Sequence, residues 1–241
     1  MYERKYYIEN FYCDQAGMLK VPYMMHFLND IMERNANSYN AGAPYHLAKN
    51  LAWVLVEYQL DIYEWPKQEG FAIVGTIPYS FKRMFGYRKY RIKDQNDHIL
   101  VAGQGKFALI NIETKTFVRP DKEMLKRFTD AKEDQVALKF QAWEVGEKTF
   151  IDSKKTFVSH DHIDINGHVN NAFFPAFAYQ ALPSQILKNQ TITQVNVKYK
   201  KEAFLNEVLA LNIFEVNQGY QIDIVRNDEI LGNVLFKTKT L

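Results

Sequence analysis

Reactive side chains are densest in the segment 160–171, which reads H-D-H-I-D-I-N-G-H-V-N-N. Within it, a carboxyl, an amide and an imidazole occupy alternate positions at Asp164, Asn166 and His168. If this stretch is extended, its alternate side chains project to the same side, so the three groups would converge on one spot. Such groups can exchange protons with a substrate or with water. The segment therefore predicts a centre for acid–base chemistry.

The residues that follow predict a helix that completes this centre. We expect the helix from about Ala172 to Leu187, with Pro183 as a kink or an early stop. It is apolar on nearly every side, which indicates a helix wrapped by a sheet. Asn170 or Asn171 can cap its first turn, and the free N–H groups there could stabilise a developing oxyanion.

Other kinds of reactive centre fit the sequence less well. The histidines and carboxylates of the segment match no closed zinc pattern, and no Cys joins them. An EF-hand register that begins at His162 puts Phe173 where a Glu is needed. There is no G-x-S-x-G elbow and no P-loop. We therefore expect no metal and no cofactor, and we interpret His160 and His162 as solvated polar residues.

The chain repeats itself, and the repeat indicates how these elements are arranged. Asp14-x-x-Gly17 returns as Asp164-x-x-Gly167, an offset of 150 residues from 14 to 164. The pattern V-x-V-x-Y at 54–58 returns at 195–199, an offset of 141 residues from 54 to 195. In each half a helix candidate precedes a run of strand candidates separated by turn residues. The sequence therefore predicts two copies of an α+β unit with antiparallel strands.

The repeat divides the chain into three segments. They are an N-terminal repeat at 1–119, a linker at 120–149 and a C-terminal repeat at 150–241. The linker is charged and compatible with a helix. Four apolar residues indicate that part of it packs rather than serving as a disordered spacer: Leu125, Phe128, Val136 and Leu138.

The string D-I-N-G-H-V-N-N at 164–171 resembles the D-x-N-x-H-V-N-N signature of the acyl-ACP thioesterases. In that family a Tyr-Arg-Arg-Glu segment follows the histidine by about thirty residues and ends in a catalytic Glu. Tyr199-Lys200-Lys201-Glu202 lies at that place here. The likeness extends into the first half through Asp14-x-x-Gly17, Trp53-Val54-Leu55 and Arg88-x-Tyr90. The resemblance implies a tandem, or double, hotdog fold of the α+β class, in which two antiparallel sheets each wrap a central helix.

The same resemblance implies hydrolysis of fatty acyl-ACP thioesters to free fatty acids. Its catalytic set would be Asp164, Asn166, His168 and Glu202. We expect Glu202 to activate water, His168 and Asn166 to position the water or the substrate, and Asp164 to hold and orient the group. The division of roles between Asp164 and Glu202 stays open. Two positions depart from the family pattern, because Gln180 replaces an acidic residue and Ala203 replaces the Cys of the plant enzymes.

The first half lacks the reactive set. By the offset of 150 residues, Ala16 and Met18 stand where the second half has Asn166 and His168. By the offset of 141, Asp61 aligns with Glu202 but has no partners. We therefore expect one active site. A helix is expected from Val21 to about Ser38, and its apolar residues are candidate walls of an acyl pocket as well as ordinary core: Met24, Phe27, Leu28 and Ile31.

Composition narrows the possible partners and location. The net charge of +2 is too small to indicate binding to nucleic acid. No run of apolar residues is long enough to span a membrane. The single Cys13 excludes an internal disulfide. With no signal peptide recognised at the N-terminus, we expect a cytoplasmic protein.

The expected partner is acyl carrier protein, which is acidic. Basic residues that could steer it towards the site are Lys82, Arg83, Lys198, Lys200 and Lys201. Two other functions stay open at this point: an acyl-CoA thioesterase on the same fold, and a non-catalytic protein that binds acyl groups or their carrier. Acyl chain-length preference and oligomeric state do not follow from the sequence.

Overall fold

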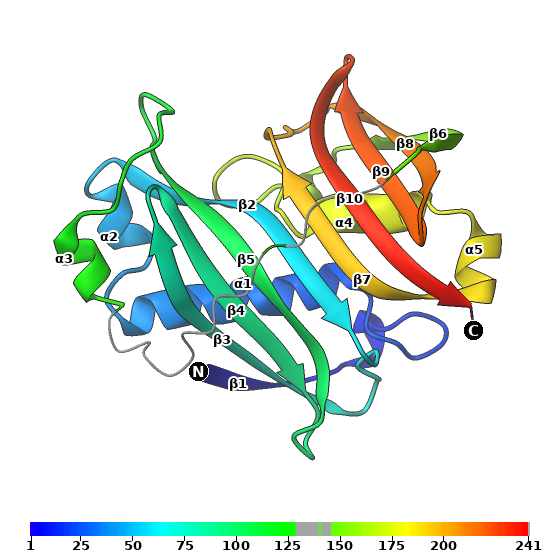
Figure 1. Cartoon of the computed structure of the whole chain (residues 1–241), viewed down its shortest axis with the longest axis horizontal. Helices are drawn as coiled ribbons and strands as arrows, with labels where there is room; N and C mark the ends of the chain where they lie inside the picture. The colour runs from blue at the N-terminus through cyan, green and yellow to red at the C-terminus, as the bar shows by residue number, and fades with distance from the viewer. Residues whose placement is uncertain (129–139, 141–145, 241) are drawn as a thin grey trace. The chain divides into compact units, whose positions relative to one another are not determined.

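The computed structural model describes residues 1–128, 140 and 146–240, and it divides into two compact units (Figure 1). Unit 1 comprises Met1–Tyr58 with Tyr63–Phe140, and unit 2 comprises Gln59–Ile62 with Gln141–Leu241. Each unit combines helices with antiparallel strands, so the predicted α+β class is confirmed. Among the described residues, none of the helices is long and apolar enough to cross a membrane.

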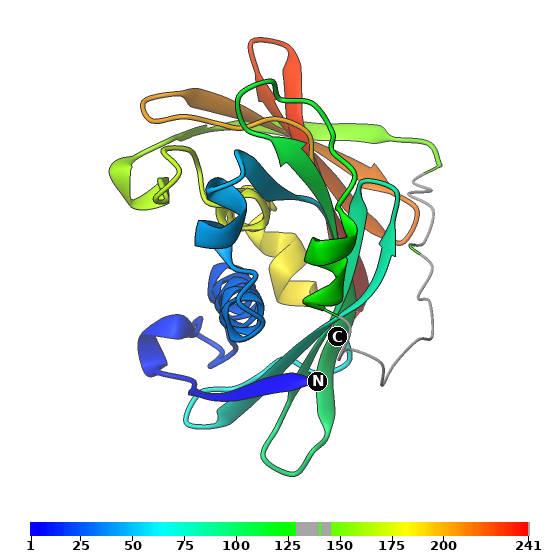
Figure 2. The ribbon, with the colours of Figure 1, turned by 90° about the vertical axis from the view of Figure 1, so that its left-hand side faces the viewer.

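Unit 1 is built around one long helix. Its elements are β1 (Tyr2–Tyr7), the short 3-10 helix η1 (Asn10–Tyr12), α1 (Val21–Ser38), α2 (Ala43–Leu47), β2 (Leu51–Ile62, whose last four residues belong to unit 2), β3 (Phe71–Lys82), β4 (Phe85–Lys93), β5 (Ile99–Asn111) and α3 (Lys122–Lys126). The strand order is β1-β3-β4-β5-β2. Figure 2 looks nearly along α1 and shows this helix on the concave side of the strands.

The sequence of α1 explains its place. Pro22 lies in the first turn, where a missing N–H costs nothing. Met24, Leu28 and Ile31 recur at helical spacing and are fully buried. This apolar stripe holds the helix against the sheet, as the periodicity predicts.

Unit 2 repeats this plan in a smaller form. Its elements are β6 (Thr149–Phe157), the 3-10 helix η2 (His160–His162), α4 (Phe173–Ala181), α5 (Ser184–Asn189), β7 (Gln190–Tyr199), β8 (Val208–Val216), β9 (Gly219–Arg226) and β10 (Glu229–Thr240). The strand order is β7-β10-β9-β8-β6. The predicted break at Pro183 is confirmed, because α4 ends at Ala181 and α5 begins at Ser184. One expected helix is thus two.

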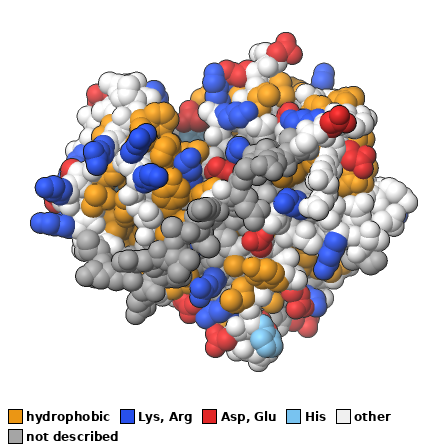
Figure 3. Space-filling model, in the orientation of Figure 1, with side chains coloured by type: hydrophobic (Ala, Val, Ile, Leu, Met, Phe, Trp, Pro, Cys, Tyr) orange, Lys and Arg blue, Asp and Glu red, His pale blue; other side chains and the backbone are white. Residues whose placement is uncertain are grey.

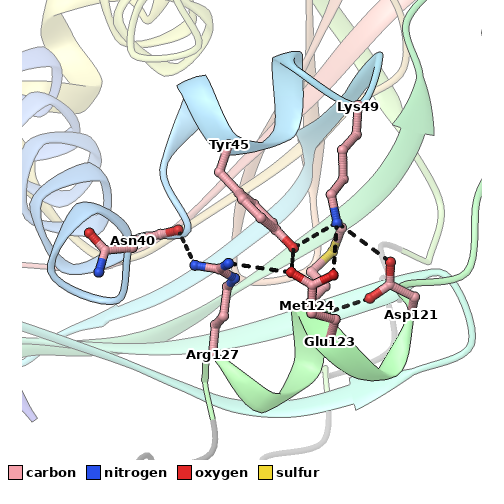
Figure 4. Close-up of polar contacts among 7 residues, drawn as sticks. All are labelled: Asn40, Tyr45, Lys49, Asp121, Glu123, Met124 and Arg127. Atoms are coloured by element: carbon pink, nitrogen blue, oxygen red, sulfur yellow. Dashed lines mark hydrogen bonds and ion pairs between the residues drawn. The ribbon is translucent and has the colours of Figure 1, made fainter.

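Part of the predicted linker packs onto unit 1 (Figure 4). The Asp121 side chain caps α3 by accepting a hydrogen bond from the Met124 N–H at 2.7 Å. Glu123 accepts from the Tyr45 hydroxyl at 3.2 Å, which ties α3 to α2, and from Arg127 at the end of α3 at 3.3 Å. Met124 and Phe128 are buried in a cluster with residues of α2 and β5 and their neighbours. Two of the linker residues expected to pack, Val136 and Leu138, lie outside the described residues.

One buried imidazole makes the stability of the protein depend on pH. His46 is 4% exposed, and its Nε2 donates to the Ala41 carbonyl at 3.0 Å. Its Nδ1 is buried and has no hydrogen-bond partner in the described part of the chain. Burial lowers the pKa of His46 below its usual value. The unfolded chain therefore takes up this proton first, so stability is lost as the pH falls below about 6.5.

We expect His46→Gln to reduce this loss, because an amide can still donate to Ala41 but does not titrate. The limiting slope for one proton is about 1.4 kcal/mol per pH unit. The measurement is the free energy of unfolding from urea titrations between pH 7.5 and 5. His98→Gln is the matched control, since the His98 side chain is 76% exposed. Equal pH slopes for the wild type and His46→Gln would contradict the prediction.

Candidate active site

Residues 164–168 form a tight turn, so the prediction that this segment is extended is wrong. The Asp164 N–H donates to the His168 carbonyl at 3.0 Å, and the Gly167 N–H donates to the Asp164 carbonyl at 3.0 Å. Asp164 Oδ1 accepts the Asn166 N–H at 2.8 Å. Gly167 has a φ of +81°, a conformation that glycine adopts without steric cost. An Asp side chain that bonds its own backbone two residues on is a strong turn former, and here it outweighs the extended alternative.

The turn nevertheless brings the expected groups together. His168 Nδ1 lies 4.0 Å from Asp164 Oδ1, and His168 Nε2 lies 3.7 Å from Glu202 Oε1. These contacts are longer than direct hydrogen bonds. The imidazole and Asp164 are mostly covered, with side chains 22% and 19% exposed, whereas the Glu202 side chain is 49% exposed. An imidazole therefore lies between two carboxylates, one of which is open to solvent.

Backbone contacts fix Glu202 beside the turn. The Val169 N–H donates to the Ala203 carbonyl at 2.8 Å, which joins the turn to the residue after Glu202. Arg226 donates to the Glu202 carbonyl at 3.3 Å. Ala203 is fully buried, and its described contribution to the site is this carbonyl. The carboxylate of Glu202 is left to face the imidazole.

Asn170 orders the chain just before α4, but the expectation that Asn170 or Asn171 caps the helix is wrong, because the N-cap is Ala172 and no side chain caps it. Asn170 Oδ1 accepts the Ala172 N–H at 3.0 Å, and its carbonyl accepts the Phe173 N–H at 2.9 Å. The Tyr199 hydroxyl donates to the Asn171 carbonyl at 3.0 Å, and burial raises the pKa of Tyr199, so this phenol stays protonated. Because two of the first N–H groups are already bonded, they are not free to receive an oxyanion. Another donor at the turn is the Asn166 side chain, which is exposed and makes no hydrogen bond among the described residues.

His162 packs against α4 and bonds the segment that follows the turn, so the interpretation of it as a solvated residue is wrong. Its Nδ1 accepts the Ser159 N–H at 3.0 Å, and its carbonyl accepts the Asn170 N–H at 2.8 Å. Its ring centroid lies 4.7 Å from that of Phe173 and 4.8 Å from that of Phe177. Burial lowers the pKa of His162, which favours the neutral imidazole. A sequence pattern carries no signal for such ring packing. His160 is exposed, as expected.

Both halves of the chain match models of known protein families. Residues 1–128 match the acyl-ACP thioesterase N-terminal domain, and residues 147–240 match the acyl-ACP thioesterase C-terminal domain. The chain belongs to the acyl-ACP thioesterase family. A curated relative, the chloroplastic acyl-[acyl-carrier-protein] hydrolase FATB1 of Cuphea viscosissima, is 24% identical over 175 residues. That match covers 68% of this chain but only 41% of the length of the relative.

Solved structures of thioesterases share the fold. An acyl-ACP thioesterase from Bacteroides thetaiotaomicron superposes with a TM-score of 0.87 at 19% identity, covering 98% of this chain and 97% of that one. The 12:0-ACP thioesterase from Umbellularia californica gives 0.87 at 15% identity, covering 99% and 97%. The predicted double hotdog fold is thereby confirmed.

Unit 1 of this family member contains a second copy of the same turn. The Asp14 N–H donates to the Met18 carbonyl at 2.9 Å, and the Gly17 N–H donates to the Asp14 carbonyl at 3.0 Å. Asp14 Oδ1 accepts from the Ala16 N–H at 2.9 Å and from the Met18 N–H at 3.0 Å. The Leu19 N–H donates to the Pro66 carbonyl at 2.8 Å, as Val169 does to Ala203. The repeated turn is therefore the same structure in both units.

This correspondence corrects the residue that matches Glu202. Because Pro66 corresponds to Ala203, Trp65 stands at the place of Glu202, and Asp61 does not. The first copy has four more residues here, since Pro66 comes 8 positions after Tyr58 whereas Ala203 comes 4 positions after Tyr199. Asp61 lies within β2 and accepts a hydrogen bond from the Gln194 side chain. With Ala16, Met18 and Trp65 at the matching places, the turn of unit 1 presents no acid–base pair.

The candidate acyl-pocket residues are all buried on α1. Met24, Leu28 and Ile31 have no exposed surface, and Phe27 is 7% exposed. The Phe27 ring packs against that of Tyr6, with centroids 4.7 Å apart, and so holds β1 against the helix. These contacts are those of a packed core, and the role of the four residues as pocket walls stays a prediction.

The basic residues considered for steering differ in their surroundings. Lys201 forms an ion pair with Glu229, which also binds Arg226 at 2.7 Å. Lys200 is exposed two positions before Glu202. Lys82 and Arg83 are exposed in the turn between β3 and β4 of unit 1, the end of that unit over which Lys and Arg side chains gather in Figure 3. Lys200 is thus the basic residue of this group that is both beside the site and without an ion pair in the described residues.

Proposed function

We propose that this protein hydrolyses fatty acyl thioesters of acyl carrier protein and releases free fatty acids. The observation that carries the proposal is the approach of Glu202 Oε1 to His168 Nε2 at 3.7 Å, at positions where the sequence resembles the signature of the family. The Glu202 side chain is 49% exposed, so water and a thioester can both reach it. Family membership supports the substrate class, and the geometry supports Glu202 as the general base.

In the proposed reaction, Glu202 takes a proton from a water molecule whose oxygen attacks the thioester carbonyl carbon. The tetrahedral intermediate then collapses, the carbon–sulfur bond breaks, and the proton held by Glu202 passes to the departing thiol. His168 positions the water or the carbonyl, because its Nε2 faces the same carboxylate. The Asn166 amide can donate to the developing oxyanion. A positioned base contributes about 10²–10⁴-fold, and one oxyanion donor about 10²–10³-fold.

The two carboxylates are suited to different roles. Asp164 Oδ1 already accepts a backbone N–H within the turn, so this residue is suited to orienting His168. Among the described residues, the Glu202 carboxylate makes no hydrogen bond, and its ionic contact is with the imidazole. We therefore assign the base to Glu202 and a positioning role to Asp164.

Acyl carrier protein is the proposed partner, with Lys200 as a contact for its acidic surface. An acyl-CoA thioesterase and a non-catalytic acyl-binding protein are the alternatives. A cytoplasmic location stays a prediction.

The test is a panel of acyl-ACPs from 8 to 18 carbons, with the released fatty acids quantified and the same chains offered as CoA thioesters. We expect turnover on acyl-ACP with a higher kcat/KM than on acyl-CoA. A higher kcat/KM on acyl-CoA would reassign the substrate. Binding of acyl-ACP without release of acid would replace the hydrolase by a binding protein.

A further inference from the structure

Two exposed apolar side chains lie close in sequence to the reacting pair, His168 and Glu202. Ile165 is 98% exposed at the tip of the turn that ends in His168, and Phe204 is 43% exposed two positions after Glu202. The hydrogen bond between Val169 and the Ala203 carbonyl joins the two segments that carry them. Single exposed apolar residues are common on protein surfaces, so a comparison within the chain is needed to decide whether this pair has a function.

The turn in unit 1 shows that the fold does not require these apolar residues. Gln15 is the counterpart of Ile165 by the offset of 150 residues, from 15 to 165. Lys67 follows Pro66 as Phe204 follows Ala203. The same turn therefore forms with two polar residues at these positions. The apolar pair occurs only in the copy that carries His168 and Glu202.

A second exposed apolar pair provides a contrast. Phe157 and Val208 are also exposed and face each other in the register of β6 and β8. Their counterparts in unit 1, Tyr7 and Phe71, face each other in β1 and β3 and are apolar as well. This pair is apolar in both copies, so it gives no information about the active site. The positions of Ile165 and Phe204 are apolar only in unit 2, so they do give such information.

We propose that Ile165 and Phe204 form a docking surface for the protein part of acyl carrier protein. The Ile165 side chain is 98% exposed, so it projects from the surface and does not line a groove. A thin pantetheine arm would therefore cover little of it. A protein surface can enclose it. Lys200 lies exposed beside the same segment, which adds a positive charge for an acidic carrier. The proposal rests on the proposed function, and it extends that function to the way the carrier is recognised.

The test replaces the two residues by a neutral polar residue, so that apolar surface is lost and no charge is added. For Ile165→Gln and Phe204→Gln, we expect kcat/KM on acyl-ACP to fall about 5–30-fold, the range of a substantial interface contact. On an acyl-pantetheine of the same chain length, which lacks the carrier, kcat/KM should stay within about twofold of the wild type. Gln15→Ser is the matched control at the other turn and should change neither value.

Three outcomes would overturn the docking proposal. Equal losses on acyl-ACP and acyl-pantetheine would place both residues at the arm or the thioester. No loss on either substrate would remove them from recognition. A dimeric wild type that becomes monomeric on Ile165→Gln would identify a contact between copies of this chain. If the wild type releases no acid from either substrate, the hydrolase proposal fails by itself, and fluorescence anisotropy of labelled holo-ACP still tests docking through the same variants.

Discussion

Glu202→Gln should lower kcat for acyl-ACP hydrolysis by about 10²–10⁴-fold while the protein stays folded. Gln keeps the size of the side chain but cannot accept a proton from water. The side chain is 49% exposed and no described hydrogen bond holds its carboxylate, so little stability depends on its charge. KM should change much less than kcat, because the carboxylate acts on the water and not on the acyl chain.

The matched control is Asp61→Asn, the residue that a constant offset between the repeats would equate with Glu202. Its carboxylate lies in β2 against Gln194, so we expect kcat to stay within about twofold of the wild type. Single-turnover kinetics on acyl-ACP, with circular dichroism spectra and urea midpoints of both variants, make the comparison. Near wild-type turnover by a folded Glu202→Gln would remove Glu202 as the base.

Much of the architecture could be predicted from the sequence, because hydrophobic periodicity and a repeated motif report on packing. The helix from Val21 to Ser38 has the expected bounds, and the break at Pro183 follows from a ring that cannot continue a helix. The tandem plan follows from the repeated D-x-x-G turn. These features are local in the chain, so one sequence carries enough information to specify them.

The local form of the site could not be predicted in the same way. Alternation in an extended segment would bring Asp164 and His168 together, but a turn closed by the Asp164 carboxylate does so instead. A D-x-N-G string fits both conformations, and the choice depends on hydrogen bonds that the pattern does not show. The match of Asp61 to Glu202 failed because the offset changes from 141 to 137 residues between Tyr58 and Pro66.

Other properties depend on contacts between distant residues. His162 packs its ring between aromatic residues of α4, and no spacing rule reveals that contact. Met24, Phe27, Leu28 and Ile31 have the same apolar signature whether they line a pocket or fill a core.

Asp14→Ala and Asp164→Ala should weaken the protein alike, yet only Asp164→Ala should impair catalysis. Each removes a carboxylate that closes the same type of turn, where Asp14 accepts two backbone N–H groups and Asp164 accepts one. We expect each to lower the free energy of unfolding by about 1–3 kcal/mol, measured by urea titration. Asp164→Ala should also lower kcat about 10²-fold, because a shift of about 1 Å in His168 is enough for such a loss. The turn around Asp14 carries no reactive pair, so its loss should leave kcat unchanged.

Asp164→Asn separates a positioning role from a catalytic charge. An Asn side chain keeps the oxygen that accepts the Asn166 N–H, and Asn forms this type of turn as readily as Asp. If Asp164 acts by holding the turn, Asp164→Asn should recover most of the kcat lost in Asp164→Ala, with the pH dependence of kcat unchanged. If its negative charge is needed against the imidazole at 4.0 Å, Asp164→Asn should be as slow as Asp164→Ala. The repeated turn favours the first result, because Asp14 builds the same structure where there is no imidazole to hold.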